Sequence, residues 1–185
     1  MKPKHIEKYL QKYKDVSSDT FTRIREFLSR RKFNKNDRKR FHDELSYFVN
    51  KEPSRIKIVF DAIPEATPRP RLGQGRWYVS NSSNNSRYTE ILVNENSDIL
   101  PMIATPCKLI VNSYMPTPGY FNKVDTLLAE LGVKRPLTKP DWDNLGKTYS
   151  DMVQKWIISD DRIIVDGESH KYYSMKPRVE IIIEY

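Results

Sequence analysis

The chain has 185 residues, of which 38% are hydrophobic and 30% charged, and its formal net charge is +8. This composition suits a globular protein and excludes a disordered chain, and no run approaches the roughly 18 consecutive apolar residues of a membrane span. The first residues lead into no apolar segment, so we expect no secretory signal. The single cysteine, Cys107, allows no disulfide within the chain. These features predict a cytoplasmic protein without a membrane partner.

The positive charge is concentrated at the N-terminal end. Residues 1–55 contain 16 Lys and Arg against 8 Asp and Glu, whereas residues 56–185 contain 16 of each kind. A basic region favours a polyanionic partner such as nucleic acid. The asymmetry indicates two regions with different roles.

The basic region has the periodicity of helices. Apolar side chains recur at helical spacing over residues 4–14 and again in two later segments. Asp19 is a candidate cap for the second helix, and Asn36 or Asp37 for the third. We therefore predict a basic, all-helical module over residues 1–52.

The remainder, residues 53–185, mixes two periods and predicts an α+β domain: a small sheet with packed helices. Strands are expected at 55–60, 107–114, 162–166 and 179–185, helices at 121–131 and 143–157, and a loop at 62–90. Gly132 is expected to stop the first of these helices.

Acidic side chains gather around the second helix of this domain. On a helical wheel Asp143, Lys147 and Asp151 share one edge, opposite an apolar face. Asp141 comes just before the helix, and an acidic pair at 160 and 161 follows it, where the chain turns into a strand. A helix and the next strand can pack side by side, so this pair can approach the first acids.

Clustered carboxylates suit phosphodiester hydrolysis. Mg²⁺ prefers carboxylate and water oxygens, and one or two such ions polarise the phosphate and activate water. A lysine among the acids can neutralise charge that develops on the phosphate. Ordinary structural roles remain open: Asp141 or Asp143 as a helix cap, Lys147 in surface ion pairs, and the later acidic pair as a turn.

The segment KPDWDNLGK over 139–147, followed by Asp151 and then by Asp160 and Asp161 ahead of a strand, resembles the motif of RusA-type crossover junction endonucleases. The resemblance covers about residues 55–185. It implies an α+β homodimer that binds four-way (Holliday) junctions, a branched DNA of recombination and repair. Cutting would need Mg²⁺, with Mn²⁺ as a substitute, and no small-molecule cofactor.

The resemblance also implies roles for individual residues. Asp141, Asp143 and Asp161 would bind the metal, Lys147 would be the catalytic lysine, and Asp160 would be an assisting acid. The spacing after Lys147 leaves open which member of the acidic pair is the direct ligand. Two further residues match the motif in supporting positions, namely Asn144 and Asp151.

An arginine-rich segment precedes the acidic motif. Arg69-Pro70-Arg71, followed by Tyr78, is similar to an Arg-Pro-Arg loop of the same family. With Arg76, these arginines are candidates for gripping phosphates or stacking on unpaired bases. Two other functions stay open: a DNA-binding protein that has lost catalysis, and a nuclease that prefers flaps or forks. The family often occurs on phages and prophages, so we expect that origin.

Overall fold

The computed structural model divides the chain into two compact units, Met1–Glu52 and Pro53–Tyr185. No helix in the described part of the chain is long and apolar enough to cross a lipid bilayer. The structure describes residues 17–30, 34–50, 52–67, 71–73, 76–78, 101–154 and 156–185.

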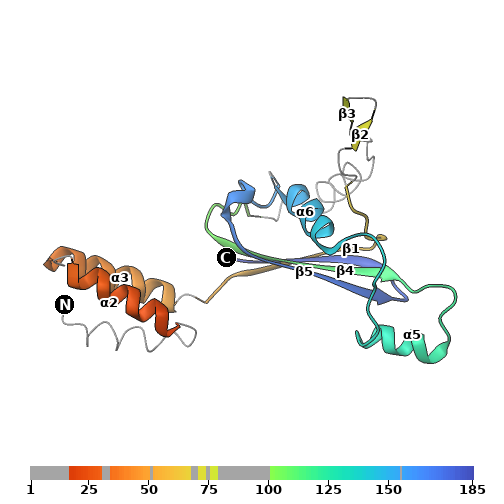
Figure 1. The fold of residues 1–185 in the computed structure, drawn as a ribbon, viewed down its shortest axis with the longest axis horizontal. Helices are drawn as coiled ribbons and strands as arrows, with labels where there is room; N and C mark the ends of the chain where they lie inside the picture. Colours follow the sequence, from red (N-terminus) through yellow and green to blue (C-terminus); the bar gives the residue numbers. More distant parts are fainter. Residues whose placement is uncertain are drawn as a thin grey trace. The chain divides into compact units, whose positions relative to one another are not determined.

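Two helices make up the described part of the first unit (Figure 1). Helix α2 spans Ser18–Arg30 and helix α3 spans Lys35–Asn50. The helix expected over 4–14 lies outside the described residues. The second and third helices of the predicted basic module are thus present.

The caps of these two helices differ from the predicted ones. The Ser17 hydroxyl accepts a hydrogen bond from the Thr20 backbone N–H at 3.3 Å, so Ser17, and not Asp19, caps α2. At α3 the Asn34 side chain accepts from the Asp37 backbone N–H at 2.9 Å, and the Asp37 carboxylate accepts from the Asn34 N–H at 3.0 Å. This pair has the reciprocal form of a capping box, so α3 starts earlier than either predicted cap allows.

Four strands of the second unit form one mixed sheet in the order β1-β6-β4-β5 (Figure 1). β6 is antiparallel to both β1 and β4, whereas β4 and β5 are parallel. Together with the helices of this unit, the mixed sheet confirms the predicted α+β fold class. The strands span Arg55–Phe60 (β1), Cys107–Pro116 (β4), Ile164–Ser174 (β5) and Arg178–Glu184 (β6).

Strand β5 differs most from its predicted position. A short 3-10 helix, η1, occupies Asp161–Ile163, so the strand begins at Ile164. It then continues to Ser174, far beyond the predicted end at residue 166. β5 is a half-exposed edge strand, so its sequence mixes polar and apolar residues without clean alternation. This explains why its full length could not be predicted from the sequence.

Alternation along the strands gives the sheet two unlike faces. One face, called the covered face below, holds the apolar core; the other, the open face, carries charged side chains. The buried apolar residues of the strands on the covered face include Ile58, Phe60, Leu109, Val111, Val179, Ile181 and Ile183.

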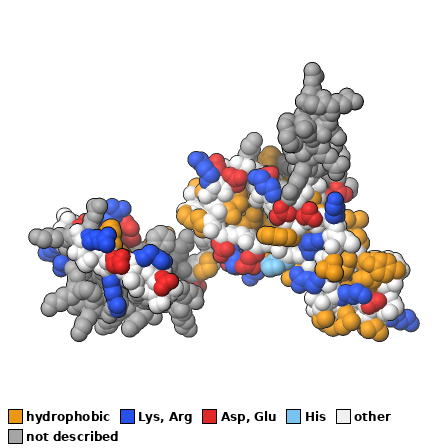
Figure 2. All heavy atoms as spheres, viewed as in Figure 1, with side chains coloured by type: hydrophobic (Ala, Val, Ile, Leu, Met, Phe, Trp, Pro, Cys, Tyr) orange, Lys and Arg blue, Asp and Glu red, His pale blue; other side chains and the backbone are white. Residues whose placement is uncertain are grey.

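Helix α5 spans Lys123–Glu130 and ends just before Gly132, whose φ of +71° confirms the predicted stop. An apolar stripe on a helix ordinarily faces a core. Among the described residues of α5, however, Ala129 alone is buried, while Leu127 is 62% and the C-cap Leu131 75% exposed. Figure 2 shows apolar side chains gathered on the surface over this helix.

The segment predicted as a loop over 62–90 contains a short hairpin, which corrects that prediction. β2 (Arg71–Gly73) pairs antiparallel with β3 (Arg76–Tyr78). Strands of three residues are too short to show a period-2 pattern in the sequence, which is the physical reason the prediction failed.

Candidate active site

Helix α6, Trp142–Val153, packs its apolar side on the covered face of the sheet (Figure 1). Its buried side chains are Leu145, Thr148, Tyr149, Met152 and Val153. The sequence predicted a helix to residue 157, but the chain leaves the helical conformation at Gln154. The backbone N–H groups of Ile157 and Ile158 both donate to the Val153 carbonyl instead of continuing the helix. Because the side chains on its apolar side are buried, the opposite edge of α6, which carries the acids, is exposed.

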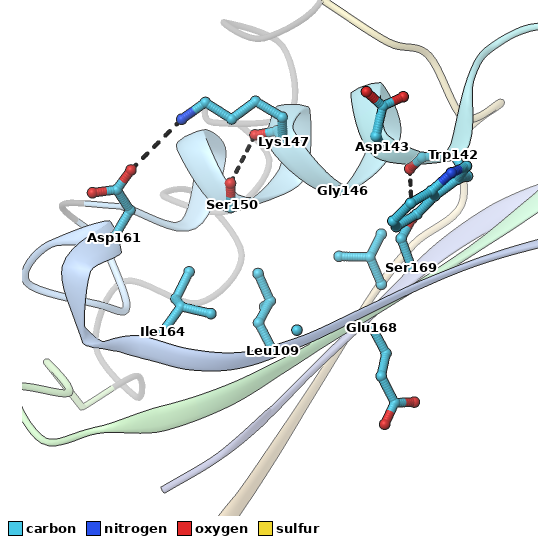
Figure 3. Close-up of a pocket in the computed structure, with 12 residues that line it drawn as sticks. Leu109, Trp142, Asp143, Gly146, Lys147, Ser150, Asp161, Ile164, Glu168 and Ser169 are labelled. Atoms are coloured by element: carbon cyan, nitrogen blue, oxygen red, sulfur yellow. Dashed lines mark hydrogen bonds and ion pairs between the residues drawn. The ribbon is translucent and has the colours of Figure 1, made fainter.

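A pocket of about 380 Å³ lies between α6 and strands β4 and β5. Three predicted site residues, Asp143, Lys147 and Asp161, line this pocket. Figure 3 shows Asp143 and Asp161 at opposite ends of the pocket with Lys147 between them. The other lining residues are Leu109, Val111, Trp142, Gly146, Ser150, Ile164, Gly167, Glu168 and Ser169.

Lys147 contacts two carboxylates. Its Nζ lies 2.6 Å from Asp151 Oδ1 and 3.6 Å from Asp161 Oδ2. The hydrogen bond to Asp151 raises the pKa of Lys147, and the charge of Asp161 adds to the effect. Lys147 is therefore an ammonium ion at neutral pH and suits charge stabilisation rather than proton abstraction.

The two neighbouring acids after α6 have different surroundings. The Asp160 carboxylate accepts hydrogen bonds from the backbone N–H and from Nε of Arg162, both at 2.9 Å, and caps η1. The Arg162 backbone N–H, followed by its guanidinium, lowers the pKa of Asp160. Asp161 lines the pocket and Asp160 does not. The predicted turn role thus applies to Asp160 alone.

Asp141 occupies the N-cap position of α6, yet its side chain makes no capping hydrogen bond. It does not line the pocket, although Asp143 two residues later does. Within the described ranges, no three acidic, histidine or cysteine side chains form a group that could hold a metal ion in this arrangement. The donor chemistry fits a hard divalent cation, because carboxylate oxygens are its preferred protein ligands.

Asn144 ties α6 to the chain that leads into the arginine-rich segment. Its Nδ2 donates to the Thr67 carbonyl at 3.1 Å. The Thr67 backbone N–H donates to Thr148 Oγ1 at 2.8 Å, and the Glu65 N–H donates to the Tyr149 hydroxyl at 3.2 Å. The sequence motif singled out Asn144 but missed its partners, because nothing local indicates a contact with a segment so distant along the chain.

Gly146 lets α6 approach β5 closely. A Cβ built on it would lie 3.3 Å from Ser169 Cβ, tighter than most real contacts. One turn before, Ser169 Oγ donates to the Trp142 carbonyl at 2.8 Å. A glycine inside a helix costs about 1 kcal/mol relative to alanine, so the close approach explains its presence.

The three predicted DNA-contacting arginines are only partly described. Arg69 lies outside the described residues. Arg71 on β2 stands opposite Tyr78 in the hairpin register, and Arg76 on β3 stands opposite Gly73. Their role remains a prediction.

Comparison with known proteins covers the second unit. The model of the family described as "Endodeoxyribonuclease RusA" matches residues 56–184, from β1 to β6, which include every acid of the site. A relative from Bacillus subtilis (strain 168), named "Uncharacterized protein YqaN", is 30% identical over 133 residues. These residues make up 70% of this chain and 94% of the relative.

Proposed function

This chain belongs to the endodeoxyribonuclease RusA family, and from that premise we propose that it is a divalent-metal-dependent nuclease that resolves four-way DNA junctions. It acts as a homodimer and makes paired nicks in opposing strands. The observation that carries the proposal is that Asp143, Lys147 and Asp161 line one pocket, although they come from two separate elements and include both acids and a cation.

Asp143 and Asp161, with Asp141 two residues before Asp143, are the residues that would hold Mg²⁺ or Mn²⁺. Bound there, such an ion supplies Lewis-acid polarisation of the phosphodiester and activation of water. The open N-cap of Asp141 supports this assignment, since a carboxylate engaged in capping would be less available. The engagement of Asp160 with Arg162 favours Asp161 as the direct ligand and Asp160 as a residue that holds the turn.

Lys147 stabilises the negative charge that develops on the phosphate as the bond breaks. Its ion pairs place the ammonium group: Asp151 holds it at 2.6 Å and leaves it within 3.6 Å of Asp161. Asp151 is therefore a positioning residue for Lys147. Asn144 positions the other side of the helix by holding the Thr67 carbonyl.

The arginines Arg69, Arg71 and Arg76 bind the DNA backbone or unpaired bases next to the cut. The basic first unit adds contacts to the duplex arms, whose strength falls with salt as counterions are released. A two-fold dimer matches the pseudo-two-fold symmetry of a four-way junction and explains paired nicks.

The test is cleavage of a labelled synthetic four-way junction by the wild type, by Asp143→Asn and by the control Asp166→Asn. Asp166 is an exposed acid on the open face that pairs with Lys108, so its loss should leave cutting intact. We expect symmetric nicks with Mg²⁺ that disappear with EDTA and fall by more than about a hundredfold in Asp143→Asn.

Two other outcomes would change the proposal in different ways. Tight junction binding without any cutting, with Mg²⁺ or Mn²⁺, would replace the nuclease by a DNA-binding protein. Faster cutting of flaps or forks than of junctions would keep the site and overturn the substrate.

A further inference from the structure

The interior of the pocket is apolar, although its rim is charged. Leu109, Val111 and Ile164 form its apolar lining on the sheet side, and Trp142 stands at one end beside Ser169 (Figure 3). The Trp142 side chain is 63% exposed, which is unusual for so large an apolar group. The proposed roles of the charged residues in cutting DNA assign no function to this apolar interior.

We propose that the pocket takes up an unstacked nucleobase next to the phosphate that is cut, with the Trp142 indole as its stacking partner. The inference rests on the proposed function and names the part of the substrate that its site recognises. A pocket of about 380 Å³ falls within the range of small-molecule sites, so a planar heterocycle has room. Trp142 stands between Asp141 and Asp143 in the chain, so the base would lie beside the edge of α6 that carries the acids.

Ser150, Ser169 and Glu168 of the lining already have partners within the protein, which favours stacking over base-specific contacts. Ser150 Oγ donates to the Lys147 carbonyl at 2.9 Å, and Ser169 Oγ donates to the Trp142 carbonyl at 2.8 Å. The Glu168 carboxylate points away from the pocket, where it pairs with Lys108 and His170 (Figure 3). A site of this kind holds any base by its flat face and discriminates weakly among the four.

Base capture also explains selection of branched DNA. Pulling a base out of a stack costs least where pairing is already interrupted, as at a branch point. An intact duplex would have to open before its phosphate reached the acids. The pocket therefore links recognition of structure to cutting, without contacts that read sequence.

The Trp142 main chain is well fixed for this role. Its carbonyl accepts the Ser169 bond, and the close approach at Gly146 holds the first turns of α6 against β5. The indole thus projects from a helix start whose backbone is held on β5.

The experiment compares Trp142→Ala, Trp142→Phe and the wild type on an ordinary junction and on junctions with an abasic site at each nucleotide flanking the mapped cut. Trp156→Ala is the matched control, since Trp156 is also exposed, at 44%, and does not line the pocket. We expect Trp142→Ala to slow cutting by about 5- to 100-fold and Trp142→Phe to restore most of the rate.

At one abasic position the cutting rate of the wild type should fall to that of Trp142→Ala on the ordinary junction. The loss from the missing base and the loss from Trp142→Ala should not add when the two are combined. Additive losses at every position, or a Trp142→Ala rate equal to that of Trp156→Ala, would overturn the base pocket while the nuclease stands. A wild type that cuts no junction would overturn the proposed function instead. In that event 2-aminopurine at the branch point decides: fluorescence quenched by wild type but not by Trp142→Ala keeps the pocket, and equal signals overturn it.

Discussion

The covered and the open face of the sheet are built from the same strands but by different interactions. On the covered face, β4 and β6 present Val111 and Ile181 to α6 and the core, with 1% and 0% of their surface exposed. On the open face, Glu180 lies between Lys57 at 3.0 Å and Arg178 at 2.8 Å. Apolar burial dominates the covered face, on which the pocket lies, whereas the open face combines charge pairing with less apolar burial, such as that of Ile182.

The two faces also carry comparable lysines. Lys147 contacts Asp151 and Asp161 above the pocket, and Lys108 contacts Asp166 and Glu168 on the open face. Each is a lysine between two acids, and the pKa of each is raised, first by a hydrogen bond to one acid, Asp151 or Glu168 respectively. Ion pairing alone therefore does not distinguish the two lysines; the pocket beside Lys147 is what supports its proposed catalytic role.

The largest expected effect is on stability and comes from the covered face. Replacing Ile181 by alanine leaves a cavity in the core and should lower the free energy of unfolding by about 2–5 kcal/mol. Ile110→Ala, at a half-buried position of β4 on the open face, should cost less than half as much. Urea denaturation of both variants measures the difference, and equal losses would mean that both faces are packed alike.

The next effect is on activity and separates the two lysines. Lys147→Met should reduce the rate of junction cutting by about 10²–10³-fold, because it removes a charge from the site. Stability should change by less than about 1 kcal/mol, since Lys147 is 62% exposed and exposed ion pairs contribute little. Lys108→Met should cut at the wild-type rate. Equal losses in the two variants would contradict the assignment of Lys147 to the site.

The smallest effect concerns the charge pairing of the open face. Burial alone would raise the pKa of Glu180, but the hydrogen bonds from Arg178 and Lys57 outweigh it and hold the pKa below its ordinary value. A carboxylate whose pKa is lowered by folding stabilises the fold at pH values above its pKa in the unfolded state, about 4.3. That contribution is lost as the pH falls through the pKa in the folded state.

Glu180→Gln should therefore lower the free energy of unfolding by about 1–2 kcal/mol at pH 7, and the gap to the wild type should narrow as the pH falls below about 4.3, the unfolded pKa. Urea midpoints across this pH range test the sign. A gap that does not narrow at all as the pH falls below this value would show that the side chain acts by shape and not by charge.

Local periodicity predicted the helix of the site well. The spacing of Asp143, Lys147 and Asp151 placed them on the exposed edge of α6, and the structure pairs two of them directly. The same wheel put Leu145 and Tyr149 on the opposite face, and both are fully buried. A helix with a strong apolar stripe determines its own orientation, so neighbours in the sequence suffice to predict it.

Contacts between distant segments were beyond such reasoning. The bond between Asn144 and Thr67, and the use of Asp160 rather than Asp161 as a turn cap, depend on where the chain returns in space. The exposure of the apolar stripe on α5 was unpredictable for the same reason, because periodicity shows that a face is apolar but not what lies against it. Local patterns thus predicted the elements of the site, and tertiary packing decided how they are used.

The central position of β6 has a consequence for how the second unit is made. β6 is the last strand along the chain, yet it pairs with both β1 and β4, while the strand just before it, β5, is not its neighbour. None of the ladders between the described strands of this sheet is a hairpin, so each requires closure of a long loop. During synthesis β1 has no partner among the described strands of the sheet until β6 emerges, and the core beneath the pocket is completed only then.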